Sequence, residues 1–360
     1  MTNATPRTPE RRPILLPAAW VYSLIIGGIN RRFDRRKGVV EFDRPVISVG
    51  NLSTGGTGKT PMVATIVRWL REAGHDPAIA MRGYAPRGGV GGILSDEART
   101  YAGMFEDLPL VAQPDRIAGL IRMFGTERGE RVDSVVLDDG FQHRQIARQL
   151  DIALIDATRD PFGDALLPVG SLREPVSSLR RADVVVLTHA DAIGEAELSS
   201  LERSVRGVAP GAIVCQCVHA WAGLRVAEAA GERDEPVAML GGMPVVVACA
   251  IGNPSAFVAQ ASRHADVRST LVLRDHHPFD GATVERVVAM AREHSARAIV
   301  VTEKDWAKMS RVPRDRWPCE VVRPVLRLEF LAGGEALLER VLETASMRLD
   351  DEEPPQIANE

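Results

Sequence analysis

The chain has 360 residues, a formal net charge of −4 and a hydrophobic share of 45%. Because a domain usually has about 100 to 200 residues, this length predicts two domains. Charges of both signs are spread along the sequence without a broad basic field, which disfavours a nucleic-acid-binding protein. The four cysteines lack C-x-x-C spacing, so neither a zinc site nor a disulfide framework is indicated.

The N-terminal segment is apolar and flanked by basic residues. Residues 14–29 carry no charge, and basic side chains follow at positions 31, 32, 35, 36 and 37. The run is shorter than the roughly 20 residues of a transmembrane helix, and no signal-peptide cleavage site follows it. We therefore expect a helix in a membrane interface, with Trp20 and Tyr22 at headgroup depth and the arginines near anionic lipid. The alternative is a helix packed on the protein's own core.

After Arg44, short apolar runs alternate with amphipathic helical stretches. Residues 60–73 have apolar side chains at helical spacing, and Gly74 ends this helix. Such alternation predicts an α/β fold with a mainly parallel sheet. The predicted strands of the first half lie at residues 45–51, 76–84, 134–140, 151–157 and 182–191.

The second half begins with a hairpin-like connection and continues as a smaller α/β unit. Its predicted strands lie at residues 244–254, 269–279 and 296–305, and its last helix at 335–345. The tail is acidic, contains proline and is predicted to be disordered. We predict a membrane-associating segment at 1–40, a first α/β domain at 41–211, a hairpin-like linker at 212–235, a second α/β domain at 236–347 and the tail at 348–360.

Residues 49–61, VGNLSTGGTGKTP, join a predicted strand to a predicted helix through a glycine-rich loop. Backbone N–H groups and the positive end of the helix dipole point into such a loop, which therefore cradles phosphate. Lys59 is expected to reach the β- and γ-phosphates and Thr60 to bind Mg²⁺. Ser53 stands where the usual motif has its first glycine. The predicted nucleotide site comprises Ser53, Thr54, Gly55, Gly56, Thr57, Gly58, Lys59 and Thr60.

Two positions bear on the nucleotide and on the class of enzyme. Thr54 occupies the place of the extra lysine of dimeric partitioning ATPases, which disfavours that class. His189, in the sequence LTHAD, occupies the place of the lysine that GTPases carry in their guanine-reading motif. ATP is therefore favoured over GTP.

The second polar cluster is VVLDDGFQHR, residues 135–144. An apolar strand that ends in Asp138 and Asp139 brings two carboxylates to the carboxyl edge of the sheet, where a P-loop fold holds its metal and substrate. Gln142, His143 and Arg144 follow at once, and the alternative is a solvated loop. The sequence thus predicts a metal and substrate site next to the P-loop.

Nine segments occur in a characteristic order along the chain: VGNLSTGGTGKTP, RGY (82–84), SDEA (95–98), DRIA (115–118), DDGFQHR, LLPVGSLREP (166–175), AIGNPSAF (250–257), DHHPF (275–279) and TEKD (302–305). In this order they resemble the tetraacyldisaccharide 4'-kinase family of the lipid A pathway. The resemblance extends from the N-terminal apolar segment to about residue 340, and DDGFQHR combined with LREP and the long P-loop is highly specific. It implies that the domain at 41–211 is a P-loop kinase domain.

The resemblance implies transfer of the γ-phosphate of ATP, with Mg²⁺, to the 4'-hydroxyl of a tetraacylated glucosamine disaccharide 1-phosphate, giving lipid IVA. It implies a peripheral enzyme at the cytoplasmic face of the inner membrane, held by its N-terminal segment, with this lipid as partner. No obligate protein partner is evident. The competing hypothesis is a membrane-recruited nucleotide switch that hydrolyses ATP without phosphorylating a lipid.

The resemblance also implies roles for individual residues. The family's catalytic aspartate falls on Asp96 and its paired histidine on His276, although Ser95 and Ala98 replace the family's glycine and proline and His277 is adjacent. Such a carboxylate would act as the general base on the sugar hydroxyl. The implied metal ligands are Thr60, Asp138 or Asp139, and Glu174; the implied substrate contacts are Asp139, Gln142, His143 and Arg173.

Two further assignments stay open. Arg173 and Glu174, adjacent in LREP, either serve the site or form a plain ion pair. Glu303, Lys304 and Asp305 follow a strand and have either a structural role or adenine-side contacts.

Overall fold

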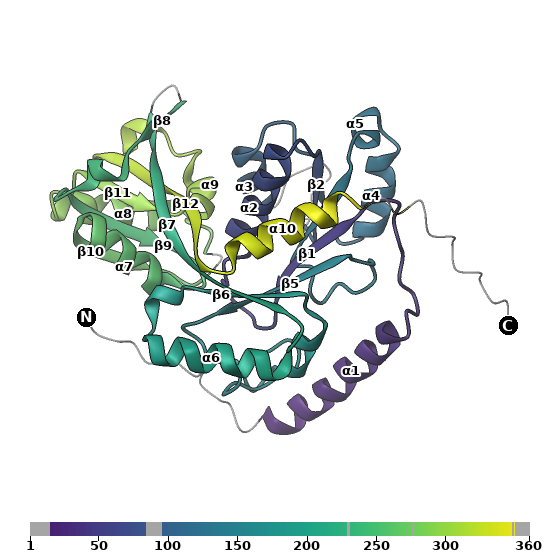
Figure 1. Ribbon diagram of the computed structural model, residues 1–360. Coiled ribbons are helices and arrows are strands. Elements are labelled where there is room, and N and C mark those ends of the chain that lie inside the picture. Colours follow the sequence, from purple (N-terminus) through teal and green to yellow (C-terminus); the bar gives the residue numbers. More distant parts are fainter. Residues whose placement is uncertain (1–14, 84–95, 229–230, 276, 348, 350–360) are drawn as a thin grey trace.

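The computed structural model describes residues 15–83, 96–228, 231–275, 277–347 and 349, arranged as one large sheet with helices on both faces (Figure 1). Within these residues the sheet has 12 strands, in the order β10-β9-β11-β12-β7-β6-β5-β1-β4-β2-β3, with β8 paired to β7. Among these strands, all pairs are parallel except those that β7 forms with β12 and β8. The predicted α/β class with a mostly parallel sheet is confirmed.

The first half of the sheet centres on β1 (Val46–Asn51), whose six residues are all buried. It lies between β4 (Ser134–Asp138) and β5 (Leu150–Asp156), so the carboxyl ends of these three strands meet at one edge. The five strands predicted in this half are confirmed, and a short sixth strand was not predicted. The remaining strands are β2 (Pro77–Met81), β3 (Leu110–Ala112) and β6 (Val184–Thr188).

Helices cover both faces of this half. The helix predicted after the glycine-rich loop is α2 (Lys59–Glu72), which buries its apolar side chains against the sheet. The other helices are α3 (Asp96–Met104), α4 (Arg116–Phe124), α5 (Glu127–Glu130) and α6 (Glu195–Val208), with the short turns η2 (Val176–Arg181) and η3 (Ala190–Ala192).

The predicted linker contains β7 (Ile213–Glu228) and β8 (Gly231–Glu235), which pair as an antiparallel ladder. The start of β7 pairs with β6, and the rest of the strand pairs with β12 (Glu320–Ala332). Because one 16-residue strand belongs to both halves, the sheet is continuous across the predicted domain boundary. The division into domains therefore remains a prediction.

The second half is a parallel array with its own hydrophobic clusters. The three strands predicted here are confirmed, with bounds that differ by up to seven residues. They are β9 (Pro244–Cys249), β10 (Asp266–Val272) and β11 (Ala298–Val301), and the helices are α7 (Pro254–His264), α8 (Gly281–Glu293) and α9 (Glu303–Met309), with turns η4 (Val237–Leu240) and η5 (Arg314–Arg316).

The last helix, α10 (Gly334–Ala345), packs on the first half. Leu337 and Val341 are fully buried in the same cluster as Ile47 of β1 and Met62 of α2. The predicted boundary at 236–347 groups this helix with the second half, and its packing differs from that prediction. The reason is that β12 runs back alongside β7 and delivers the chain to the face of the first half (Figure 1).

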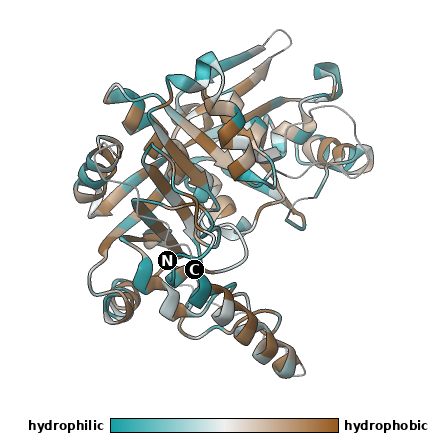
Figure 2. Ribbon diagram, turned by 90° about the vertical axis from the view of Figure 1, so that its right-hand side faces the viewer, coloured by the Kyte–Doolittle hydropathy of each residue, from teal (hydrophilic) through white to brown (hydrophobic). Residues whose placement is uncertain are grey.

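The N-terminal helix α1 (Leu16–Asp34) lies at the periphery of the molecule (Figure 1), and hydrophobic residues occur along its length (Figure 2). None of its residues is buried. Among the described residues, no helix combines the length and the hydrophobicity needed to cross a bilayer. The large apolar side chains that it exposes are Leu16, Trp20, Val21, Leu24, Ile25 and Ile29.

Candidate active site

The predicted glycine-rich loop joins β1 to α2. Gly55 and Gly58 adopt φ angles of +111° and +84°, a region open to glycine but strained for residues with a side chain. Gly58 caps α2, so Lys59 and Thr60 form the first turn of the helix. The backbone N–H groups at this end have no partner within the helix, which makes the loop a site for anions.

Lys59 lies between the loop and the end of β4. Its Nζ donates to Asn51 Oδ1 at 3.2 Å and lies 3.5 Å from Asp139 Oδ1. The side chain is 17% exposed, so the ammonium group is largely shielded from water. The structure thus brings together Lys59 and Asp139, which the sequence placed in one site.

Asp139 holds a second cation. Arg173 Nη1 donates to both of its oxygens, at 2.8 and 3.0 Å, and also to Gln142 Oε1 at 3.3 Å. Burial alone would raise the pKa of Asp139, but Lys59 and Arg173 outweigh it and hold the pKa below its ordinary value. Asp139 therefore stays ionised and holds the ammonium group of Lys59 and the guanidinium group of Arg173 next to the glycine-rich loop.

Asp138 points to a different neighbour. Its Oδ2 accepts a hydrogen bond of 3.0 Å from the hydroxyl group of Tyr101, and the residue is 5% exposed. Tyr101 lies on α3, the helix that begins at Asp96. This contact ties α3 to the carboxyl end of β4, although the side chain of Asp96 lies outside the described part of the chain.

Glu174 does not fit the predicted metal role. Both of its oxygens accept hydrogen bonds from Arg181, at 2.8 and 2.9 Å, and Asn30 of α1 donates to Oε2 at 3.0 Å. With 2% exposure, the carboxylate is enclosed by these donors. The alternative of an ion pair between Arg173 and Glu174 is also wrong, because the two neighbours bind different partners, Asp139 and Arg181.

The LREP segment lies along the glycine-rich loop through backbone hydrogen bonds. Arg173 N donates to Leu52 O at 2.7 Å, and Thr54 N donates to Ser171 O at 2.8 Å. This pairing directs the Arg173 side chain towards Asp139. On the other side, the Tyr22 hydroxyl of α1 donates to Arg173 O at 2.9 Å. The Tyr22 hydroxyl group therefore points to the protein, and its place at headgroup depth stays a prediction.

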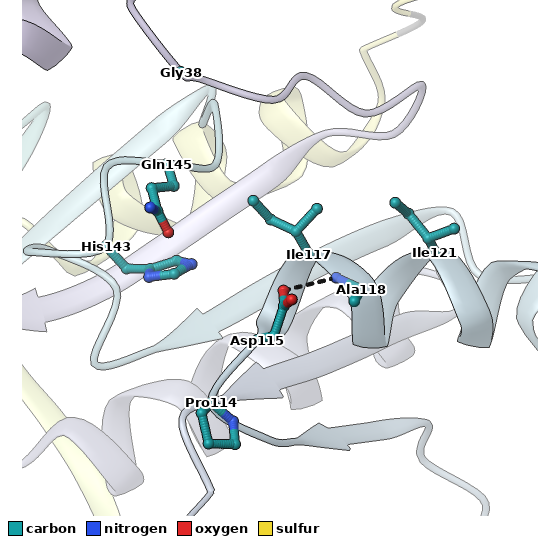
Figure 3. Close-up of a pocket in the computed structure, with 8 residues that line it drawn as sticks. All are labelled: Gly38, Pro114, Asp115, Ile117, Ala118, Ile121, His143 and Gln145. Carbon is teal, nitrogen blue, oxygen red and sulfur yellow. Dashed lines mark hydrogen bonds between the residues drawn. The ribbon is translucent and has the colours of Figure 1, made fainter.

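His143 faces a separate cavity of about 510 Å³ (Figure 3). Burial, and then the nearby Arg116 and Arg148, lower the pKa of His143 to about 4, so the ring is neutral near pH 7. The cavity has polar and apolar walls, which suits an amphipathic molecule. It is lined by Gly38, Pro114, Asp115, Ile117, Ala118, Ile121, His143 and Gln145.

The DHHPF and TEKD segments meet in the second half. Lys304 Nζ lies 3.1 Å from Asp275 Oδ1, and the fully buried Asp305 accepts a hydrogen bond from Ala250 N at 3.0 Å. These contacts favour the structural role for TEKD. His276 lies outside the described residues, and His277 Nδ1 accepts from the backbone N–H of Phe279 at 3.1 Å.

Several residues at the site were not predicted from sequence. His219 of β7 lies under the glycine-rich loop, because a Cβ added at Gly58 would be 2.6 Å from its Nε2. Burial lowers the pKa of His219 to about 3, with a smaller contribution from His189. Arg116 donates to Asp139 O at 3.4 Å and belongs to the DRIA segment, a signal that could have found it. Asn51 likewise belongs to the VGNLSTGGTGKTP segment, whereas Tyr101 lies in none of the segments that carry the resemblance.

Comparisons with known proteins agree with this geometry. The family model described as tetraacyldisaccharide-1-P 4'-kinase matches residues 11–345. A tetraacyldisaccharide 4'-kinase of Geobacter metallireducens is 38% identical over 290 residues, covering 76% of this chain and 81% of the relative. One of Chlorobium chlorochromatii is 32% identical, covering 94% and 95%. A crystal structure of LpxK from Aquifex aeolicus in complex with ATP aligns with a TM-score of 0.68 at 25% identity, covering 92% of this chain and 98% of that one.

Proposed function

Since the chain belongs to the tetraacyldisaccharide 4'-kinase family of lipid A biosynthesis, we propose that its residues form a donor site at the glycine-rich loop and an acceptor site at the His143 cavity. The enzyme transfers the γ-phosphate of ATP to the 4'-hydroxyl of a tetraacylated glucosamine disaccharide 1-phosphate. The two sites must adjoin, because phosphoryl transfer needs donor and acceptor oxygens in line.

The donor site rests on one observation, the cluster of Lys59, Asp139 and Arg173 at the mouth of the loop. Both cations share one carboxylate. An incoming triphosphate supplies the negative charge that draws Lys59 towards its β- and γ-phosphates. Asp139 stays paired with Arg173 and so keeps a guanidinium beside the transferring group.

A magnesium ion fits the oxygen donors near the loop. Mg²⁺ in kinases is held by one or two protein oxygens, phosphate oxygens and waters. The Thr60 hydroxyl group and the Asp138 carboxylate are the residues that would hold it, and we leave out the enclosed Glu174. When bound, the ion would neutralise charge on the phosphates.

For the general base we retain Asp96, paired with His276, on the strength of the family motif. The contact between Tyr101 and Asp138 supports this role, because it fixes the helix that begins at Asp96. General-base help is worth about 10² to 10⁴ in rate. Asp96→Asn should therefore lower kcat by at least about a hundredfold while ATP affinity is kept, and an unchanged kcat would remove Asp96 from this role.

The acceptor site is assigned to the cavity at His143 and to Gln142 and Arg173, which contact each other at 3.3 Å. A neutral imidazole can donate and accept hydrogen bonds with sugar hydroxyl groups. Ile117 and Ile121 offer apolar surface to an acyl chain. Ile121→Asp should raise the KM for the disaccharide, whereas Leu331→Asp, at a residue with the same 58% exposure, should not.

The exposed face of α1 supports a peripheral enzyme at the cytoplasmic face of the inner membrane. Six large apolar side chains of this helix stay exposed in the described part of the chain, and a lipid interface would cover them. Asn30 and Tyr22 fasten the opposite side of the helix to the LREP segment. A membrane-bound α1 would thus hold the site close to an acceptor whose acyl chains stay in lipid.

The test is incubation with ATP labelled at the γ-phosphate and the disaccharide 1-phosphate. We expect label in the lipid phase and ADP release in step with the acceptor added. ATP hydrolysis without acceptor, and no labelled lipid, would contradict the kinase and favour the nucleotide switch.

A further inference from the structure

A loop of the second half lies directly on the glycine-rich loop. Residues 250–253 connect β9 to α7, and a Cβ added at Gly252 would lie 2.3 Å from Gly56 N and 3.0 Å from Gly56 Cα. The two backbones thus approach as closely as glycine permits. Gly56 is one of the residues expected to surround the phosphates, so this contact reaches the donor site.

Two side chains fasten that contact. Asn253 Nδ2 donates to Asp156 Oδ2 at 3.1 Å, joining the start of α7 to the carboxyl end of β5. Arg159 donates to Gly252 O at 2.7 Å and to Thr54 O at 3.4 Å, so one guanidinium bridges the two loops. The loop at 250–253 is therefore held to the first half by Asp156, through Asn253, and by Arg159, through Gly252.

The two carboxylate oxygens of Asp156 contact different halves of the protein. Oδ2 accepts from Asn253, while Oδ1 accepts from Thr158 Oγ1 at 2.7 Å and lies 3.2 Å from His189 Nδ1. The residue is 3% exposed. Burial alone would raise the pKa of Asp156, but the hydrogen bonds from His189 and Thr158 hold it below its ordinary value.

The Asp156 carboxylate is also connected to the other face of the glycine-rich loop, through His189 and His219. The His189 ring lies on the His219 ring with centroids 4.4 Å apart, and His219 abuts Gly58. Thr188 Oγ1 donates to Thr57 O at 3.1 Å beside them. Asp156 is therefore connected to both faces of the loop, through Asn253 above and through His189 below.

We infer that Asp156 and Asn253 are positioning residues that clamp the 250–253 loop onto the glycine-rich loop and thereby set its affinity for ATP. This inference rests on the proposed donor site. The two side chains act through Gly56 and Gly58, so their loss should weaken ATP binding and leave the KM for the disaccharide unchanged.

The test exchanges the two side chains. In Asn253→Asp two carboxylates oppose each other, although the new one can still cap α7 at Ala256 N, as Asn253 does. In Asp156→Asn two amide donors oppose each other. The double variant restores one donor and one acceptor, because the new amide at position 156 donates to the new carboxylate at position 253. The oxygen of that amide can still accept from Thr158.

We expect each single variant to weaken binding of a non-hydrolysable ATP analogue, measured by calorimetry, about tenfold, the usual cost of one charge-assisted hydrogen bond. The double variant should bind within about threefold of the wild type. Wild-type affinity in Asn253→Asp, or a double variant no better than the singles, would overturn the inference.

A second pair of variants tests the same inference if the exchange variants do not fold. Gly252→Ala pushes a methyl group into the Gly56 backbone and should weaken analogue binding about tenfold or more. Gly281→Ala, at an open position in the same half, should bind as the wild type does. Equal affinity in the two alanine variants would also overturn the inference.

Lys59→Ala separates this inference from the donor site itself. If the wild type binds no analogue, or Lys59→Ala binds it equally well, the proposed donor site fails. If Lys59→Ala loses binding while Asn253→Asp and Gly252→Ala keep it, the donor site stands and only the clamp fails.

Discussion

The helices α1 and α2 are both rich in apolar residues, and they use them in opposite ways. Of the two, α1 is the more hydrophobic, yet none of its 19 residues is buried. By contrast, seven of the 14 residues of α2 are buried. Hydrophobicity therefore does not by itself tell which surface a helix will cover.

The difference lies in what each helix meets. The apolar side chains of α2 recur at helical spacing and pack against the sheet, with polar residues on the other side. The side chains of Tyr22, Asn30 and Asp34 join α1 to the rest of the protein through hydrogen bonds, and Trp20 stays 65% exposed. The core stabilises α2, whereas α1 is left with an apolar face for a surface outside the protein.

The largest expected effect comes from the first residue of α2. Lys59→Ala should lower kcat/KM about a thousandfold, because it removes a charge aimed at the transferring phosphate. Lys37→Ala, at an exposed lysine after α1, is the matched control and should keep wild-type activity in detergent micelles. Near-normal turnover of Lys59→Ala would contradict the assignment of the first turn of α2 to the donor site.

Next in size is the packing of α2. Leu70 is 0% exposed, so Leu70→Ala should lower the free energy of unfolding by about 2–5 kcal/mol through lost burial and a cavity. Leu24→Ala, at 52% exposure on α1, should change it by less than about 0.5 kcal/mol. Urea titrations measure both, and a similar loss in the two variants would mean that α1 packs on the core.

The apolar face of α1 should matter for lipid instead. Trp20→Ser combined with Ile25→Ser should lower binding to vesicles containing anionic lipid about tenfold or more, since both side chains are more than half exposed and available to the interface. Vesicle co-sedimentation measures this binding. Equal sedimentation of variant and wild type would remove α1 as the anchor.

The smallest effect concerns the contribution of His219, which lies under the loop that precedes α2, to the stability of the protein in acid. The pKa of His219 is about 3 in the folded chain, below its ordinary value of about 6.5, so the unfolded chain binds the extra proton first. The stabilising contribution is fully present above about pH 6.5 and is lost as the pH falls towards 3. Between pH 7 and 5, Tm should fall less in His219→Gln than in the wild type; parallel curves would contradict this.

The elements nearest the site follow from local sequence. Apolar runs that end in polar residues predicted β1 and β4, and the glycines with Lys59 and Thr60 predicted the loop between β1 and α2. Parallel strands end at one edge, so Asp138 and Asp139 could be expected beside Lys59. The local sequence does not show which charged side chains pair with each other. Glu174 is an example, because it was predicted as a metal ligand and its carboxylate is enclosed by Arg181 and Asn30.

The sequence by itself determined the class of fold, the phosphate loop, the two carboxylates at the end of β4 and the apolar character of α1, because each depends on residues close together in the chain. Only the tertiary structure decided that β7 joins both halves, that His219 and Asn253 approach the loop, and that Tyr22 faces inward. These contacts join residues far apart in sequence, and burial and hydrogen bonding select their partners only when the chain is folded.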